Sequence, residues 1–283
     1  MSYINSDSLV STDWLARHGT APDVRVVDGS WFLPSAGRDA RGEYAEAHIP
    51  GAAFFDIDDI ADTDSPLPHM LPAPEKFASR VRKLGLGDGN RIVVYDALGL
   101  FSAARVWWMF RAFGHNDIAV LDGGLPKWLA EGRPTEAGPA MPQERHFTAR
   151  LNNLMVRDLD QVQSNIASAR AQLLDARPAG RFNGIVPEPR SNLRSGHVPG
   201  SLSLPYADLL DPDTGTMRAA DALRTRFESA GIDLSRPVVT TCGSGVTACI
   251  LALGLHLLGH RDVAVYDGSW TEWGGHADTP IEV

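Results

Sequence analysis

Short apolar runs recur along the chain, and each one predicts a buried strand. They are bounded by polar, glycine or proline positions, and most are rich in Val and Ile. Because these runs are apolar on both faces, we expect their strands to be covered on both sides. The predicted strands lie at residues 24–27, 92–95, 118–121, 173–174, 237–240 and 263–266.

Longer segments with helical spacing of apolar residues lie between these runs. The first predicted helix contains Trp14, with Ser11 or Thr12 as its N-cap. Further helices are predicted at residues 77–84, 102–113, 159–169, 219–230 and 246–258, and glycines at 85, 114 and 259 end three of them. Alternating strands and helices predict an α/β fold with a mainly parallel sheet and helices on both faces.

The chain contains an internal repeat, visible as four short matches in the same order. Each match is separated from its copy by nearly the same number of residues, which chance would rarely produce. The matches are IAVLDGG at 118–124 with VAVYDGS at 263–269, GH at 114–115 with 259–260, HIPG at 48–51 with HVPG at 197–200, and VVD at 26–28 with LLD at 173–175. The sequence therefore predicts two copies of one fold.

The boundaries of the copies follow from the segment between them. Residues 133–142 are rich in proline and glycine, which favours an extended linker without a core of its own. We assign the first domain to residues 1–135, the linker to residues 136–150 and the second domain to residues 151–283.

Composition narrows the class of protein. Among 283 residues, 43% are hydrophobic and 22% charged, which is typical of a soluble globular protein, and the net charge of −9 argues against nucleic-acid binding. Residues 1–10 lack the basic flank and apolar core of a signal peptide, and no apolar run is long enough to span a membrane. Two cysteines offer no disulfide framework, which fits a reducing, cytoplasmic location.

One of these cysteines lies in the loop TTCGSGVTA at 240–248, between a predicted strand and a predicted helix. Gly243 and Gly245 allow backbone angles that would turn successive N–H groups toward Cys242, and a helix N-terminus favours an anion there. Because thiolate is the reactive form of cysteine, we predict that Cys242 is a nucleophile. The alternative is a small buried residue without chemistry, and that is our interpretation of Cys249, inside the apolar helix. A disulfide between the two is beyond reach, since helix rise separates them by about 10 Å.

The first copy lacks this cysteine. Asp96 occupies the position that corresponds to Cys242, and Leu98 to Phe101 replace the small glycine turn. We therefore expect the first copy to be catalytically inactive and to supply one wall of the pocket.

The sequence resembles the tandem rhodanese-like family of 3-mercaptopyruvate sulfurtransferases over essentially its whole length. The matching segments are GRDAR at 37–41, HIPGAAFFDID at 48–58, HMLP at 69–72, VWWMFRAFGH at 106–115 and the loop CGSGVTA at 242–248. The resemblance implies transfer of sulfur from 3-mercaptopyruvate through a persulfide on Cys242 to a thiol or cyanide acceptor, with release of pyruvate.

Three alternatives to this reaction differ from it in their chemistry. A thiosulfate:cyanide sulfurtransferase is disfavoured because such relatives have Arg and Lys after the cysteine, whereas Gly243 and Ser244 are neutral. A non-catalytic sulfur-carrier or partner-binding module is the second alternative. A cysteine phosphatase, which needs Arg six positions after its cysteine, is disfavoured because that position is Ala248.

The resemblance also implies further site residues. Arg181 and Arg190, in GRFNG and PEPR, are the candidates for binding the substrate carboxylate and ketone, although Val186 replaces a family glutamate. Ser244, with Asp58 and His69 from the first copy, matches a family proton relay, which would place the site between the domains. The expected substrate-binding residues of the loop are Gly243, Gly245, Val246 and Thr247.

We expect no cofactor and no metal, since neither cysteine lies in a zinc-ligand pattern. Thioredoxin-like dithiols or small thiols are the acceptors that the resemblance implies. We expect a monomer, because two fused copies already bury the face that a homodimer would share.

Overall fold

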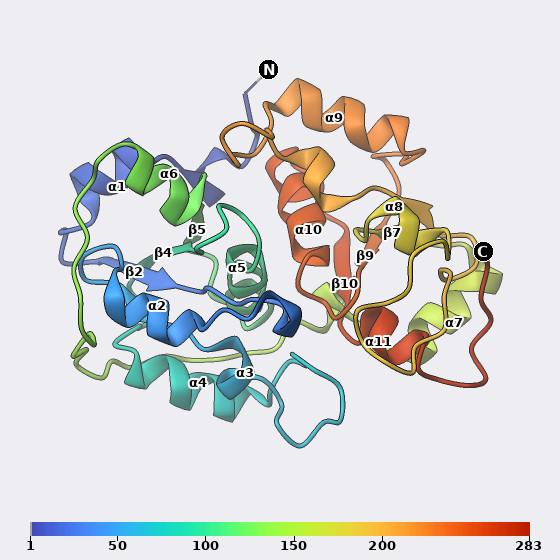
Figure 1. Cartoon of the computed structure of the whole chain (residues 1–283), viewed down its shortest axis with the longest axis horizontal. Coiled ribbons are helices and arrows are strands. Elements are labelled where there is room, and N and C mark those ends of the chain that lie inside the picture. The colour runs from blue at the N-terminus through green and yellow to red at the C-terminus, as the bar shows by residue number, and fades with distance from the viewer. Residues whose placement is uncertain (1) are drawn as a thin grey trace.

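The computed structural model describes residues 2–283 and contains two five-stranded parallel sheets, one in each half of the chain (Figure 1). The strand orders are β1-β5-β4-β2-β3 and β6-β10-β9-β7-β8, so the two sheets have the same topology. The prediction of two copies of a parallel α/β fold is confirmed. Met1, the first residue of our predicted first domain, lies outside the described residues.

The elements of the first half alternate as the pattern predicts. Its strands are β1 (Leu9–Val10), β2 (Val24–Asp28), β3 (Ala53–Phe54), β4 (Arg91–Tyr95) and β5 (Ile118–Leu121). Its α-helices are α1 (Thr12–His18), α2 (Ala40–Glu46), α3 (Ile57–Ile60), α4 (Pro74–Lys83), α5 (Ala103–Ala112) and α6 (Gly124–Ala130), with 3-10 turns at Ser6–Ser8 and Pro34–Ala36. The Ser11 side chain accepts a hydrogen bond from the Trp14 N–H, so Ser11 is the N-cap of α1.

The second half repeats this arrangement. Its strands are β6 (Val156–Arg157), β7 (Gln172–Asp175), β8 (Leu202–Ser203), β9 (Val238–Thr241) and β10 (Val263–Tyr266). Its α-helices are α7 (Leu159–Ser168), α8 (Ala179–Phe182), α9 (Ala220–Ser229), α10 (Ala248–Leu257) and α11 (Ser269–Trp273), with 3-10 turns at Asn153–Met155 and Tyr206–Leu209.

The repeated His-x-Pro-Gly motif has a structural role in both halves. His48 stacks on Tyr44 and His197 stacks on Phe182, and each ring Nδ1 hydrogen-bonds the backbone carbonyl of its stacking partner. Each motif also pairs with a distant segment, through bridges of His48 with Glu136 and of His197 with Glu282. The repeat at this motif therefore reports shared folding, not shared chemistry.

The two halves pack against each other through helices α5 and α10, which lie side by side (Figure 1). Both helices are buried nearly all round, so their apolar residues belong to one continuous core. Burial of apolar surface on both sides of this contact stabilises one fixed arrangement of the halves. The cavity next to the N-termini of these two helices therefore lies between halves that are held in a fixed arrangement.

The segment between the halves is extended and runs back along the first half (Figure 1). Phe147 from this segment is fully buried against Phe77 and Phe110 of the first half. Near the N-terminus, the Tyr3 hydroxyl donates to the Arg218 carbonyl at 2.6 Å, so the N-terminal residues contact the second half. None of the helices within residues 2–283 has the length and apolar character needed to cross a bilayer.

Candidate active site

Cys242 lies where β9 ends and α10 is about to begin, the position that the loop motif predicts. Its side chain is only 2% exposed and lines a cavity of about 130 Å³ between the two halves. The Cys242 N–H donates to Ser269 Oγ at 3.2 Å, and its carbonyl accepts from the Trp270 N–H at 2.9 Å. The turn after β10 therefore holds the cysteine loop in place.

The two glycines of the loop are needed for different reasons. Gly245 has a φ of +77°, and a Cβ there would lie 2.7 Å from the Asp267 carbonyl oxygen. Gly243 does not take a positive φ, which corrects the expectation that both glycines supply unusual angles. Instead, a Cβ on Gly243 would lie 3.1 Å from Nη2 of Arg181, so this glycine makes room for a guanidinium.

The backbone N–H groups of residues 243–247 donate to no protein acceptor within the described chain. Gly243, Ser244, Val246 and Thr247 line the cavity beside Cys242, whereas the Gly245 carbonyl turns away and accepts from Arg105. Unpaired donors beside a cysteine at a helix N-terminus favour an anionic sulfur or substrate oxygen.

The first half shows what this loop position does without a thiol. Asp96, the residue that corresponds to Cys242, is buried, and its carboxylate accepts the N–H groups of Leu98 at 2.8 Å, Phe101 at 2.7 Å and Ala103 at 2.8 Å. Burial raises the pKa of Asp96, and these hydrogen bonds oppose that effect. In this copy the turn between strand and helix gathers its N–H groups around an anionic side chain.

Arg181, within the short helix α8, and Arg190, from the loop that follows α8, both line the cavity. Arg181 pairs with Glu188 through its Nε at 3.1 Å and its Nη2. Arg190 has no carboxylate partner among the described residues, and its Nη2 donates to Ser244 Oγ at 3.3 Å. The pKa of Arg190 is lowered, chiefly by burial, and the Coulomb interaction with Cys242 only partly offsets this effect. An unpaired guanidinium beside the nucleophile is suited to binding a substrate carboxylate.

Arg177 is a site residue that our sequence reasoning missed. It is buried, forms a forked pair with Asp175 at 2.7–3.1 Å and donates to Glu188 at 2.8 Å. Glu188 is therefore shared by Arg177 and Arg181. The repeat could have indicated this position, because Asp175 matches Asp28. The carboxylate of Asp175 accepts the backbone N–H of Arg177, as that of Asp28 accepts the backbone N–H of Ser30.

Asp58 and His69 lie together, as the resemblance implies. His69 Nδ1 is 2.7 Å from Asp58 Oδ1, and the Trp31 Nε1–H donates to Asp58 Oδ2 at 2.9 Å. Burial alone would raise the pKa of Asp58, but the hydrogen bonds and charge of His69, with further help from Trp31 and Arg190, hold it below its usual value. The pair is thus set up to keep the carboxylate ionised beside the ring.

The structure does not bring His69 into hydrogen-bond contact with Ser244. The guanidinium of Arg190 lies between them, with Nη2 at 3.4 Å from His69 Nε2 and at 3.3 Å from Ser244 Oγ. When the His69 ring is neutral, its Nε2 must accept in this contact, because a guanidinium only donates, and the remaining ring proton lies on Nδ1, facing Asp58.

Arg105 and Asp267 join the pieces of the site across the domain interface, and the sequence reasoning missed both. Arg105 is fully buried on α5; its Nη1 donates to Asp267 Oδ1 at 2.6 Å and to the Gly245 carbonyl at 3.2 Å, and its Nη2 donates to the His69 carbonyl. Asp267 Oδ2 accepts the Leu71 N–H at 2.8 Å. His69 has a φ of +64°, a costly conformation for a residue with a Cβ, and these bonds hold it there. The signal was a charged residue inside an apolar helix.

Cys249 is a packing residue, as predicted. It is fully buried, its thiol donates to the Gly245 carbonyl at 3.2 Å, and burial raises its pKa. Both cysteines are free thiols.

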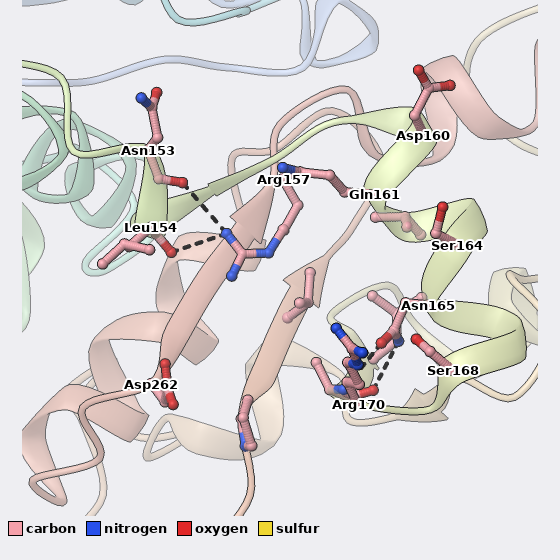
Figure 2. Close-up of a pocket in the computed structure, with 15 residues that line it drawn as sticks. Asn153, Leu154, Arg157, Asp160, Gln161, Ser164, Asn165, Ser168, Arg170 and Asp262 are labelled. Carbon is pink, nitrogen blue, oxygen red and sulfur yellow. Dashed lines mark hydrogen bonds between the residues drawn. The ribbon is translucent and has the colours of Figure 1, made fainter.

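A larger hollow of about 650 Å³ lies on the second half, next to β6 and α7 (Figure 2). Its Arg157 donates to the carbonyls of Asn153 and Leu154, at 3.4 and 3.1 Å, and its described lining includes neither cysteine nor histidine. We therefore place the chemistry at Cys242. No group of three or more potential metal ligands of the His, Cys, Asp and Glu types occurs in residues 2–283.

Comparison with known proteins agrees with this geometry. The Rhodanese-like domain family matches residues 11–131 and again residues 158–276. Human 3-mercaptopyruvate sulfurtransferase is 47% identical over 272 residues, covering 94% of this chain and 91% of the human protein. Rat thiosulfate sulfurtransferase is also 47% identical, over 273 residues, with the same coverage of both chains. Among solved structures, SseA from Escherichia coli, a 3-mercaptopyruvate sulfotransferase with the rhodanese fold, has a TM-score of 0.86 and 40% identity, covering 93% of this chain and 98% of its own.

Proposed function

Since the chain belongs to the rhodanese-like sulfurtransferases and is a sulfur-transferring enzyme, we propose that its sulfur donor is 3-mercaptopyruvate and that Cys242 carries the sulfur as a persulfide. The observation that carries this proposal is the environment of Cys242. A buried thiol lies beside free backbone donors and an arginine without a carboxylate partner, in a cavity of about 130 Å³. That volume is below the usual range for drug-sized ligands and suits a three-carbon acid.

In the proposed reaction the Cys242 thiolate attacks the substrate sulfur while Arg190 and Arg181 hold the carboxylate and ketone. The carbon–sulfur bond breaks, and its electron pair moves into the ketone to give the enolate of pyruvate. The loop N–H groups and the Ser244 hydroxyl stabilise the enolate oxygen. A proton on carbon completes pyruvate, and the persulfide stays on Cys242. An acceptor thiolate then attacks the outer sulfur and regenerates the Cys242 thiolate.

We propose that His69, Asp58 and Ser244 supply the proton as a relay. When a substrate carboxylate draws Arg190 onto itself, the guanidinium would leave the position where it now separates His69 Nε2 from Ser244 Oγ. Replacing Ser244, Asp58 or His69 by Ala should lower kcat for pyruvate release. Unchanged kinetics in all three variants would remove the relay from the mechanism.

The second candidate is a thiosulfate:cyanide sulfurtransferase. The human and rat relatives carry the two different donor names at equal identity, so overall similarity favours neither donor. The neutral Gly243 and Ser244 after the nucleophile favour mercaptopyruvate, because the thiosulfate dianion would be better matched by cations.

The donor is tested by measuring kcat/KM for 3-mercaptopyruvate, from pyruvate release, and for thiosulfate, from thiocyanate formation. We expect the mercaptopyruvate value to be higher by at least about tenfold, which corresponds to about 1.4 kcal/mol in transition-state binding. A higher value for thiosulfate would reverse the assignment. Absence of turnover with both donors would favour the non-catalytic carrier module.

We further propose a thiol acceptor, either a thioredoxin-like dithiol or a small thiol, and a monomer in the cytoplasm. One relative, from Arabidopsis thaliana, is named as mitochondrial. Sedimentation of the purified chain and localisation of a tagged copy would test the last two proposals.

A further inference from the structure

The turn and short helix that follow β10 hold the backbone of the cysteine loop through several hydrogen bonds. Because β10 pairs with β9, helix α11 begins beside the loop that follows β9 (Figure 1). The Cys242 N–H donates to Ser269 Oγ at 3.2 Å, and the Cys242 carbonyl accepts from the Trp270 N–H at 2.9 Å. The Gly243 carbonyl accepts twice from Thr271, from its N–H at 2.8 Å and from its Oγ1 at 2.6 Å. These contacts fix the direction of two successive peptide groups.

The first half keeps one of these contacts and lacks the others. The N–H of Leu125, at the start of α6, donates to the Asp96 carbonyl at 3.0 Å, as its counterpart does in the second half. The residues on either side of Leu125 are Gly124 and Pro126, in place of the serine and threonine of α11. Glycine has no hydroxyl, and proline has neither a hydroxyl nor an N–H, so the remaining contacts cannot form there. The serine and threonine contacts therefore accompany the reactive cysteine, not the fold.

Ser269 has a backbone conformation that is unfavourable for serine. Its φ is +50°, close to the +53° of its first-half counterpart Gly124, and left-handed angles disfavour a residue with a Cβ. The fold alone would therefore favour glycine at this position. Serine adds a hydroxyl, which donates to the Tyr266 carbonyl at 2.8 Å and presents a lone pair to the Cys242 N–H. The contact with the nucleophile thus accounts for a serine in this conformation.

Thr271 controls the direction of one of the unpaired N–H groups beside the sulfur. In a planar trans peptide, the C=O and the following N–H point to opposite sides. Because Thr271 holds the Gly243 carbonyl toward α11, the Ser244 N–H points away from α11, none of whose residues is among those that line the described cavity. In the first half, the N–H of Leu98, which corresponds to Ser244, donates to the Asp96 carboxylate at 2.8 Å. The same N–H in the second half is therefore directed toward the side chain of the nucleophile.

We propose that Ser269 and Thr271 are positioning residues for sulfur transfer, which act through the backbone of Cys242 and Gly243. They direct the Ser244 N–H toward the sulfur or toward the substrate oxygen on which negative charge develops. The inference rests on the proposed role of Cys242 and extends it to two residues that touch no substrate. Because preorganised donors stabilise charge that develops in the transition state, loss of either hydroxyl should lower kcat and leave KM nearly unchanged.

Thr271→Val tests this inference, because it removes the hydroxyl and keeps the shape and the N–H of the residue. Turnover is measured with the donor, 3-mercaptopyruvate or thiosulfate, for which the parent protein has the higher kcat/KM. We expect kcat to fall by about tenfold, less than for loss of a whole oxyanion-hole donor, while KM stays within about twofold. Thr271→Ser retains the hydroxyl and should have the parent kcat. Parent kcat in Thr271→Val, or an equal loss in Thr271→Ser, would overturn the proposal.

Thr279→Val is the matched control, because the Thr279 hydroxyl also donates to a backbone carbonyl at 2.6 Å, that of Trp273 at the far end of α11. This variant should lower the midpoint of thermal unfolding without lowering kcat. A loss of kcat equal to that of Thr271→Val would show that loosening of α11 in general accounts for the effect, and would overturn the proposal.

Ser269→Gly and Ser269→Ala test the second residue, and they decide the question if Thr271→Val does not fold. Both remove the hydroxyl, but glycine relieves the left-handed angle, so Ser269→Gly should be the more stable of the two. We expect kcat to be lowered to a similar extent in both. Parent kcat in Ser269→Gly would mean that the residue acts only in folding and would overturn the proposal. A parent protein that prefers thiosulfate would correct the donor assignment and leave this comparison of variants unaffected.

Discussion

Two arginines lie over the cysteine loop, and their partners differ. Arg181 is held by Glu188, which Arg177 also binds, so its position is fixed before any substrate arrives. Among the described residues, Arg190 hydrogen-bonds only Ser244 and His69 and has no carboxylate partner. Arg190, whose positive charge is not paired with a carboxylate, can therefore gain most from binding a substrate carboxylate.

Arg190→Gln should therefore lower kcat/KM for 3-mercaptopyruvate by about ten- to a hundredfold, the loss of a charge-assisted hydrogen bond of about 1.5–3 kcal/mol. Steady-state pyruvate release measures the effect. Arg224→Gln, a helix-surface arginine of α9, is the matched control and should behave as the parent protein. Parent-like kinetics in Arg190→Gln would exclude this residue from substrate binding.

The contact between Asp58 and His69 should make stability depend on acid pH. The pKa of Asp58 is lowered in the fold, so the unfolded chain takes up the proton first on acidification. The stabilising contribution of ionised Asp58 is complete above the usual aspartate pKa and is lost as the pH falls through the lowered value.

Urea unfolding of the parent protein and of Asp58→Asn measures this effect across the acid range. The difference in unfolding free energy between them should be greatest near neutral pH and should shrink toward low pH. A difference that grows on acidification would contradict the pairing seen in the structure.

At the scale of elements, the same strand–turn–helix unit occurs in both halves and surrounds a different side chain in each. In the first half, the turn between β4 and α5 wraps its N–H groups around the carboxylate of Asp96. In the second half, the turn between β9 and α10 presents Cys242 at the same place, with its N–H groups unpaired. Replacing a carboxylate by a thiol and shortening the side chains of the turn opens the same anion-binding geometry to a substrate.

The Arg105–Asp267 pair connects α5 to the end of β10 and should be needed for both stability and rate. Arg105→Met leaves Asp267 as an unpaired buried charge, which costs about 3–5 kcal/mol. Thermal and urea unfolding should show this loss. The double variant Arg105→Met, Asp267→Leu should recover much of the stability, because no unpaired charge remains.

The double variant should nevertheless keep a low kcat, since no guanidinium then holds the carbonyls of His69 and Gly245 together. Recovery of kcat together with stability would show that the pair acts only in folding.

The sequence predicts those elements whose pattern is local. Strand β4 and helix α10 lie within a few residues of their expected bounds, because each has an apolar run long enough to show its period. The two-residue strands β1, β3, β6 and β8 are missed, since two residues carry no period and their position depends on a neighbouring strand.

In the candidate site, too, the residues that sequence predicts depend on a local pattern, and those that it misses depend on distant segments. Cys242 is found because its strand, turn and helix are contiguous in the chain. Arg105 and Asp267 are missed because they meet across 162 positions of sequence, and only the packing of α5 against α10 brings them together. The separation of His69 from Ser244 by Arg190 likewise depends on three distant segments.

At the scale of the whole molecule, duplication followed by divergence explains where the site lies. The first half has the fold without the thiol; it contributes Trp31, Leu33 and Phe101 to the cavity lining, and its Asp58–His69 pair contacts the cavity-lining Arg190. The shared core beneath α5 and α10 holds both contributions in register. A half expressed alone would lack one wall of the site.

Sulfur transfer by this protein requires Cys242 to accept a sulfur atom from the donor, and intact-protein mass spectrometry tests this most directly. Mixed with 3-mercaptopyruvate in the absence of acceptor, the protein should gain the mass of one sulfur atom, located on Cys242 by peptide mapping, and should release one pyruvate for each persulfide formed. Cys242→Ser should show neither, whereas Cys249→Ser should behave as the parent protein. Pyruvate release by Cys242→Ser, or sulfur found on Cys249 instead, would contradict the account.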